Sequence, residues 1–169
     1  MTTPDRDVRP ATEGDLPALN AIYNHYVKTS HATFDIEPKS IEWREAWFRD
    51  HASSRHRIYV ATLDDRVAGF ASSGPYRARP AYDTSVETTV YVSPDCVGRG
   101  IGVALYSALF EVLAQEDVHR ALAGIALPNE PSVALHRKFG FRQAGRFTEQ
   151  GRKFGRYWDV AWFERPIGP

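Results

Sequence analysis

Gly98-Arg99-Gly100-Ile101-Gly102 is the stretch of the sequence that decides the fold. It follows a strictly alternating run over residues 85–92, typical of a strand, and precedes a helical pattern over residues 102–116. Glycines between a strand and a helix let backbone N–H groups close on an oxyanion, and the helix N-terminus adds partial positive charge. The turn therefore predicts a phosphate or pyrophosphate site. The alternative is a turn that only tightens the connection.

Two common nucleotide-binding motifs do not explain this turn. A Walker loop ends in Lys followed by Ser or Thr, and that pair is missing after Gly102. A dinucleotide-binding fold carries its glycine-rich turn after the first strand, whereas here the turn follows a later strand. The turn thus fits neither a Walker loop nor a Rossmann fingerprint.

Two helices separated by a long loop are predicted before the turn. The first begins after a short form of the capping box, made by Thr12 and Asp15. Its apolar positions, at helical spacing, are Leu16, Leu19, Ile22, Tyr23 and Tyr26. The second helix has a predicted buried stripe of Trp43, Trp47 and Phe48. The polar loop over residues 29–39 between the two helices is long enough to act as a lid.

The other segments predict strands and one further helix. Apolar runs over residues 58–63 and 67–73 flank Asp64-Asp65 and predict an antiparallel hairpin. The alternating run before the glycine turn presents a carboxylate, Glu87, on one face. The later elements are a strand over residues 121–127, a helix over 132–139, and strands near 142–148 and 157–163. Residues 1–169 are therefore predicted to form a single α+β domain whose mixed, mostly antiparallel central sheet is flanked by helices.

Composition narrows the classes of partner and the compartment. The chain has 43% apolar residues, a formal net charge of zero and scattered basic residues, so binding to nucleic acid or to an anionic membrane is not expected. Residues 1–5 show no basic or hydrophobic signal segment, and no apolar run is long enough to span a membrane. The cytoplasm is the expected compartment. Cys96 is the only cysteine, which excludes an internal disulfide and a cysteine-based zinc site.

A second group of residues downstream of the turn points to a family. Its members are Asn129, Ser132, Leu135, His136, Gly140 and Phe141. Together with the glycine turn they resemble the GNAT acetyltransferase superfamily, in which that turn binds the coenzyme A pyrophosphate. Four further stretches, within a resemblance that spans residues 8–163, look like the phosphinothricin and methionine sulfoximine acetyltransferases. They are Val90-Tyr91-Val92-Ser93-Pro94, Ala81-Tyr82-Asp83 before Glu87, Leu127-Pro128-Asn129-Glu130-Pro131-Ser132-Val133, and Lys153-Phe154-Gly155 before Trp158-Asp159-Val160.

The resemblance implies an N-acetyltransferase that uses acetyl-CoA as cosubstrate and needs no metal. It implies that the acetyl group passes to the α-amino group of a small amino-acid-like substrate by direct attack in a ternary complex, and that the enzyme is a homodimer. The residues implied in coenzyme binding are Val90, Tyr91, Val92, Val97, Gly98, Arg99, Gly100, Ile101, Gly102, Asn129 and Ser132. The superfamily usually carries Gln or Arg at the place of Val97, and Arg99 is expected to supply the missing cation.

Acetyl transfer from a thioester to an amine needs a neutral nucleophile, a carbonyl polariser and a proton for the departing thiolate. The resemblance places the catalytic base at Glu87, which by itself would be interpreted as a solvated strand carboxylate. His136, where many members of the superfamily carry tyrosine, is expected to protonate the thiolate or to position the substrate. A buried structural histidine is the alternative.

The acceptor is expected to lie beside the loop that precedes the Glu87 strand. Arg77 and Arg79, with Tyr82 close behind, suit the capture of a carboxylate, phosphinate or sulfoximine oxygen. Phe34 in the 29–39 loop is the candidate for packing on the substrate side chain. The alternatives are plain surface charge for the arginines and ordinary core packing for Phe34.

Three other functions stay open from the sequence alone. A protein or peptide N-acetyltransferase would need an open groove where two closed loops are expected. A non-catalytic acyl-CoA-binding module is conceivable because of Val97. A generic α+β interaction domain would bind no coenzyme.

Overall fold

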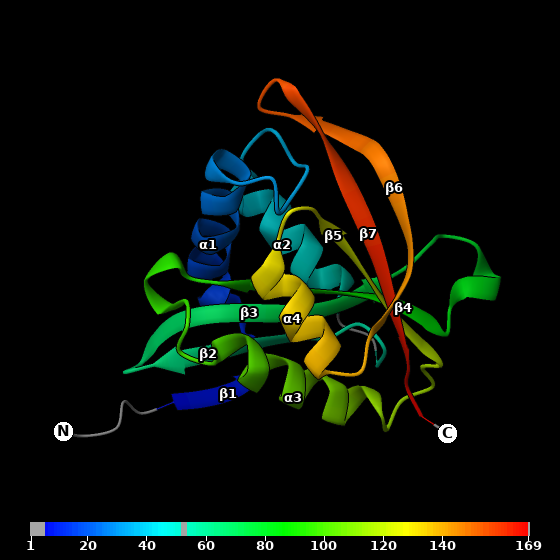
Figure 1. The fold of residues 1–169 in the computed structure, drawn as a ribbon. Helices are drawn as coiled ribbons and strands as arrows, with labels where there is room; N and C mark the ends of the chain where they lie inside the picture. Colours follow the sequence, from blue (N-terminus) through cyan, green and yellow to red (C-terminus); the bar gives the residue numbers. More distant parts are fainter. Residues whose placement is uncertain (1–5, 52–53, 169) are drawn as a thin grey trace.

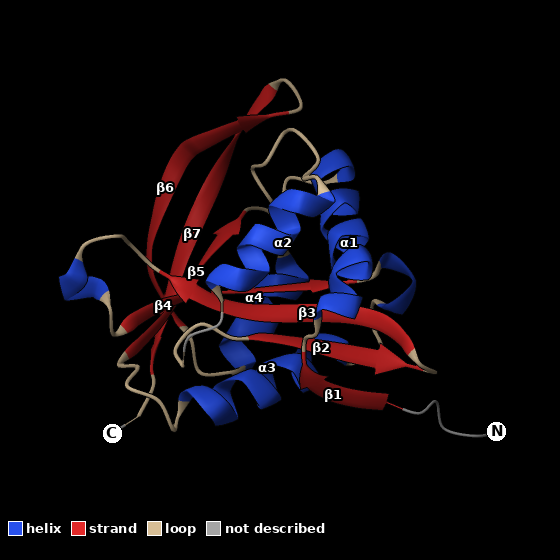
Figure 2. Ribbon diagram, turned by 180° about the vertical axis from the view of Figure 1, so that it is seen from behind, coloured by secondary structure: helices blue, strands red, loops and turns tan. Residues whose placement is uncertain are grey.

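The computed structural model describes residues 6–51 and 54–168. In chain order its helices and strands are β1 (Arg6–Pro10), α1 (Leu16–Thr29), α2 (Ile41–Asp50), β2 (Ile58–Leu63), β3 (Arg66–Pro75), β4 (Ser85–Val92), α3 (Ile101–Leu113), β5 (Arg120–Ala126), α4 (Glu130–Lys138), β6 (Arg142–Lys153) and β7 (Arg156–Pro166). The described strands form one seven-stranded sheet, with α1 and α2 on one face and α3 and α4 on the other (Figures 1 and 2). The predicted α+β fold is confirmed.

The strand order of the sheet is β1-β2-β3-β4-β5-β7-β6. Neighbouring strands run antiparallel except β4 and β5, which are parallel, so the predicted mixed and mostly antiparallel sheet is confirmed. The parallel pairing begins at Ser85 and stops at Glu87. Beyond this point β4 continues to Val92 and β5 to Ala126 without pairing to each other, so the two strands diverge in the middle of the sheet.

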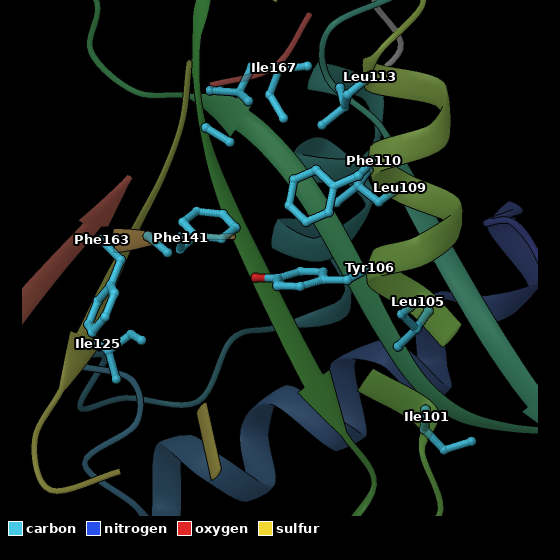
Figure 3. Packing of buried hydrophobic residues seen from close by; sticks show 14 of the residues in the cluster. Ile101, Leu105, Tyr106, Leu109, Phe110, Leu113, Ile125, Phe141, Phe163 and Ile167 are labelled. Atoms are coloured by element: carbon cyan, nitrogen blue, oxygen red, sulfur yellow. The ribbon is translucent and has the colours of Figure 1, made fainter. Parts of the chain in front are cut away.

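Each face of the sheet has its own apolar core. On one face α3 presents a row of buried side chains to the strands (Figure 3): Ile101, Leu105, Tyr106, Leu109, Phe110 and Leu113. On the other face the buried residues are Leu16, Leu19 and Ile22 of α1 with Ile58, Val60 and Phe70 of the sheet. Spacings of three and four residues place each set on one side of its helix, and each fully buried leucine contributes roughly 1.5–3 kcal/mol.

The predicted apolar stripe of α2 is wrong at one position. Trp43 is 41% exposed, whereas Arg44 beside it is only 2% exposed. Trp47 and Phe48 do pack against the core, as predicted. The Arg44 guanidinium lies 4.8 Å from the ring centroid of Tyr23 and 4.6 Å from that of Trp47. These cation–π contacts compensate part of its lost hydration, so an arginine occupies the inner face of the helix.

Two-residue turns with positive φ join two hairpins of the sheet. Asp64 and Asp65 connect β2 to β3, which confirms the predicted hairpin. Phe154 and Gly155 connect β6 to β7 in the same way. Strand β6 extends well beyond its predicted end near residue 148, because nearly all of its side chains are exposed and give no alternation.

The strand β1 is absent from the prediction, since its charged residues show no apolar alternation and it pairs only with β2 at the edge of the sheet. Its Arg9 donates to the Asp15 carboxylate at 2.7 Å. The same carboxylate accepts from the Thr12 backbone N–H at 2.7 Å, which confirms the capping interaction before α1.

Within the described residues, no helix has both the length and the apolarity that a membrane crossing requires. The expectation based on residues 1–5 lies outside the described residues.

Candidate functional site

A cavity of about 600 Å³ opens where β4 and β5 diverge. Its lining includes Thr88, Thr89, Val90, Tyr91 and Val92 of β4, Ala123, Gly124, Ile125 and Ala126 of β5, and Asn129, Ser132, Leu135 and His136 at α4. Beyond Glu87, β4 has no β5 partner, so its backbone amides and carbonyls on that side can pair with an extended ligand. The predicted coenzyme-binding residues of β4 thus lie in the wall of a cavity.

The glycine turn forms a second, smaller cavity of about 350 Å³. Val92, Val97 and Pro131 line both cavities, so the two adjoin. Gly98 and Gly100 have φ of 80° and 75°, a conformation that a side chain would strain. Gly100 caps α3 without a side-chain hydrogen bond, so the first N–H groups of this helix stay free for an anion.

Two residues of the turn fix α3 in place. Ile101 is 1% exposed and belongs to the core. A Cβ at Gly102 would lie 3.1 Å from Leu135 Cδ2, so glycine there allows α4 to approach α3 closely. The structure therefore gives these two residues a packing role.

Charge at the smaller cavity differs from the expectation in one respect. Val97 is 61% exposed and Arg99 is also exposed, with its carbonyl accepting a hydrogen bond from Arg6. Lys138 of α4 lines the same cavity. Sequence reasoning missed this lysine, because only the close packing of α4 on α3 brings it to the glycine turn.

A buried histidine lies on α4, whose residues line both cavities. The Asn129 side chain caps α4 by accepting from the Ser132 N–H at 3.3 Å. His136 is 3% exposed, and its Nδ1–H donates to the Ser132 carbonyl at 2.7 Å. Its Nε2 lies 2.9 Å from the hydroxyl of Tyr106, which reaches across from α3 (Figure 3). Tyr106 also lines the larger cavity and was not predicted as a site residue.

Burial favours the neutral form of both groups. It lowers the pKa of His136, so that the imidazole is neutral at pH 7, and it raises the pKa of Tyr106. With the only imidazole proton on Nδ1, Nε2 is an acceptor and the Tyr106 hydroxyl is its donor. In this arrangement His136 has no N–H to give at Nε2.

Glu87 is half-buried on β4, paired with Gly74 of β3 and Leu122 of β5. Glu87 points to the same face of the strand as Thr89, two residues later. Thr89 lines the larger cavity, whereas Glu87 does not. Burial raises the pKa of the Glu87 carboxyl, and the positive charge of Arg77 lowers it in part. A carboxylate with a raised pKa near an opening is suited to accept a proton.

The predicted acceptor loop presents an aromatic and cationic surface near Glu87. Arg77 and Arg79 are exposed, and the Arg77 guanidinium lies 4.9 Å from the ring centroid of Tyr76. Tyr76 in turn lies 5.6 Å from Tyr82 and 6.0 Å from Trp162 of β7. Tyr76 and Trp162 were missed, because contact between the loop and β7 has no local sequence signal.

The loop between α1 and α2 reaches the larger cavity through residues other than the predicted one. Ser30, His31 and Ala32 line that cavity. Phe34, which is outside the lining, packs so closely on β6 that a Cβ at Gly151 would lie 2.2 Å from its ring. The packing alternative for Phe34 is therefore the one that this geometry favours.

Comparisons with known proteins agree with the fold. The family model of the acetyltransferase (GNAT) domain matches residues 8–162. The chain is 55% identical over 168 residues to a phosphinothricin N-acetyltransferase of Streptomyces coelicolor, covering 98% of each chain. It is 36% identical over 163 residues to an L-methionine sulfoximine/L-methionine sulfone acetyltransferase of Pseudomonas aeruginosa, covering 96% of this chain and 95% of the relative. A solved phosphinothricin acetyltransferase of Sinorhizobium meliloti in complex with acetyl-CoA has a TM-score of 0.92 at 32% identity, covering 96% of this chain and 89% of that one.

Proposed function

Because the chain belongs to the GNAT acetyltransferase family, we propose that it transfers the acetyl group of acetyl-CoA to the α-amino group of a small amino-acid-like substrate of the phosphinothricin or methionine sulfoximine type. The observation that carries this proposal is the 55% identity, over 98% of the chain, with a phosphinothricin N-acetyltransferase. The two adjoining cavities supply a binding site of matching chemistry.

Acetyl-CoA fits the groove formed by these cavities. The open backbone edge of β4 beyond Glu87 suits the amides of the pantetheine arm, which would bind as an extra strand. The pyrophosphate would face the backbone of Gly98 and Gly100 and the N-terminus of α3, with Arg99 and Lys138 as nearby cations. The thioester would then lie near the point where β4 and β5 diverge, beside Thr89.

Glu87 is the proposed catalytic base. Its carboxylate removes a proton from the substrate ammonium, directly or through water, and the neutral amine attacks the thioester carbonyl. The C–N bond forms, the C–S bond breaks, and the thiolate of coenzyme A takes up the proton that the nitrogen loses as it becomes an amide. Since Nε2 of His136 carries no proton, we assign His136 a positioning role: it orients the Tyr106 hydroxyl at the wall of the cavity.

Arg77, Arg79 and Tyr82 are proposed to bind the anionic end of the acceptor. Arg77 is the stronger candidate of the two arginines, because its charge acts on Glu87 and its guanidinium stacks on Tyr76. Phe34 is proposed to act on the acceptor only through the wall that its loop forms, since it packs on Gly151.

We also propose that the enzyme is a homodimer. The β6–β7 hairpin exposes three aromatic side chains, Phe147, Phe154 and Tyr157, each more than half exposed. Exposed aromatic residues on an edge strand are suited to an interface between copies. Light scattering at micromolar concentration should give twice the chain mass of 19.1 kDa, and a monomer mass would contradict this assembly.

A thiol-release assay with acetyl-CoA tests the proposed activity. The panel contains phosphinothricin, methionine sulfoximine, free amino acids, polyamines and short peptides. Release with the first two, and little with peptides, is the expected result. Activity confined to peptides would identify a protein N-acetyltransferase instead, and tight acetyl-CoA binding without release would identify a non-catalytic binding module.

A further inference from the structure

The last residue of β6, Lys153, is an ammonium group inside the protein. Its exposed fraction is 4%, and its Nζ donates to the Ser30 carbonyl at 2.7 Å and to the Thr33 carbonyl at 2.8 Å. Among the described residues, Lys153 forms no salt bridge. Burial lowers its pKa. Its hydrogen bonds go only to neutral carbonyls, and its Nζ also lies 5.0 Å from the ring centroid of Phe154. A buried cation without a carboxylate partner is costly, so its presence calls for a role beyond filling space.

The two carbonyls bracket the part of the α1–α2 loop that forms the cavity wall. Ser30, His31 and Ala32 line the larger cavity, and Thr33 follows at once. Because one ammonium holds the peptide groups at both ends of this segment, it fixes the position of the wall between them. We call residues 30–33 the wall segment.

Further contacts join the wall segment to β7 and to the loop before α4. The His31 ring stacks on Trp158, with centroids 4.0 Å apart and planes 2° apart. Its Nε2–H donates to the Pro128 carbonyl at 2.8 Å. The Trp158 indole N–H donates to the Lys153 carbonyl at 2.9 Å. In Figures 1 and 2 the hairpin of β6 and β7 and the α1–α2 loop meet at the same end of the molecule.

The rest of the loop is anchored independently of Lys153. The Lys39 backbone bonds to the side chains of Asn20 and Asn24, at 2.8 to 2.9 Å. Tyr23 bonds to the side chain of Asp35, and also to that of Thr33 at the end of the wall segment. The loop over residues 29–39 therefore has many anchors, and the Ser30 and Thr33 carbonyls are the part of it that Lys153 holds.

We propose that Lys153 is a positioning residue that holds the wall segment and thereby restricts the acceptor to small free amino-acid-like molecules. This inference rests on the proposed function. The wall segment lines the larger cavity, and in this proposal it stands where a peptide acceptor would have to continue beyond its first residue. Loss of the two Lys153 hydrogen bonds lets the wall move, which weakens the fit of a small acceptor and admits a longer one.

The test compares Lys153→Met, which keeps the length of the side chain, with Lys28→Met at an exposed lysine of α1. With phosphinothricin as acceptor, Lys153→Met should raise the acceptor KM about tenfold, change the acetyl-CoA KM less than about twofold, and increase relative turnover of an alanine dipeptide. Lys153→Arg keeps charge and donors and should recover most of the acceptor affinity. Lys28→Met should match the wild type.

Hydrogen exchange of the wall segment, measured on the same variants, separates this inference from the proposed function. Exchange there should accelerate in Lys153→Met and stay unchanged in Lys28→Met. An inactive wild type would refute the proposed function while the exchange result still decides the role of Lys153. Unchanged exchange, or an unchanged acceptor KM in an active enzyme, would overturn the inference. If Lys153→Met folds poorly, Lys153→Gln, which keeps a donor but neither the charge nor the length of lysine, must accelerate the same exchange or the inference is wrong.

Discussion

The coenzyme side and the acceptor side of the groove are built in different ways. On the coenzyme side, β4 leads through the glycine turn directly into α3, so one continuous stretch of chain supplies most of the binding surface. On the acceptor side, the Arg77 loop, Glu87 of β4 and Trp162 of β7 come from separate parts of the chain: the charge of Arg77 acts on Glu87, and Tyr76 of the same loop lies 6.0 Å from Trp162. The wall segment lines the larger cavity. The first surface is mainly backbone, whereas the second is made of side chains.

This difference predicts how each side fails. A backbone surface is damaged by adding atoms, because a new Cβ blocks approach or strains a left-handed residue. A side-chain surface is damaged by removing or neutralising a group. The ionisable groups differ as well: burial keeps His136 and Tyr106 neutral at the larger cavity, while Glu87 and Arg77 interact through their charges.

The largest effect is expected from Glu87→Gln, which keeps the shape and removes the base. At pH 7, kcat should fall roughly a hundredfold or more, with acetyl-CoA affinity unchanged. Raising the pH should recover part of the loss, because the substrate then arrives deprotonated. Burial raises the folded pKa of Glu87, so the ionised carboxylate costs stability above that pKa, and the variant should melt at the same or a higher temperature. Equal loss at pH 7 and pH 10 would exclude Glu87 as the base.

Gly100→Val tests the coenzyme side by adding a side chain. The left-handed conformation at φ 75° and the new side chain beside the α3 N-terminus should raise the acetyl-CoA Kd about tenfold or more. Arg99→Ala is the comparison, because it removes a side chain at the neighbouring position. It should raise the acetyl-CoA Kd by only about a few-fold, since Arg99 is exposed. Calorimetric titration with coenzyme A measures both variants. Equal losses would mean that side-chain charge, not the backbone, holds the pyrophosphate.

Arg77→Ala tests the acceptor side by removing a charged side chain, and it should also change the pH dependence of kcat/KM. It should raise the acceptor KM several-fold, by about 5–10, with the acetyl-CoA KM unchanged. The charge of Arg77 lowers the raised pKa of Glu87, so its removal should move the acidic limb of kcat/KM to higher pH. Arg79→Ala is the comparison and should leave that limb in place. If the acidic limb of kcat/KM does not move in either variant, Arg77 does not act on Glu87.

The same contrast explains what could be predicted from the sequence. The glycine turn, the Glu87 strand and the α3 core pattern are local, so spacing alone indicated them. Lys138, Trp162 and the wall segment depend on contacts between distant elements, which leave no period in the sequence. The strands β1 and β6 were missed or shortened because edge strands with exposed side chains show no alternation.

Helix α2 shows the limit of hydrophobic periodicity most clearly. A pattern of apolar residues favours burial of Trp43, yet the helix turns Arg44 inward. Arginine carries a long apolar stem and a flat cation that packs on rings, so it can occupy a core position when aromatic neighbours surround it. A pattern that divides residues only into apolar and charged ones cannot predict that an arginine is buried in this way.

The smallest effect is expected at this buried arginine. Its Nε lies 3.4 Å from Asn20 Oδ1, its Nη2 has no hydrogen-bond partner among the described residues, and burial lowers its pKa to about 10. Arg44→Met keeps an unbranched side chain against Tyr23 and Trp47 and removes the incompletely paired charge. The free energy of unfolding should therefore change by less than about 1 kcal/mol, or rise.

Arg44→Ala is the control, because it removes the stem as well as the charge. It should lower the free energy of unfolding by about 2–3 kcal/mol through the cavity it leaves among the rings. Urea unfolding followed by tryptophan fluorescence measures both variants. If Arg44→Met costs as much as Arg44→Ala, the cation–π contacts of the guanidinium stabilise the fold. Arg44 would then be a stabilising charge on the face of the sheet that α1 and α2 cover.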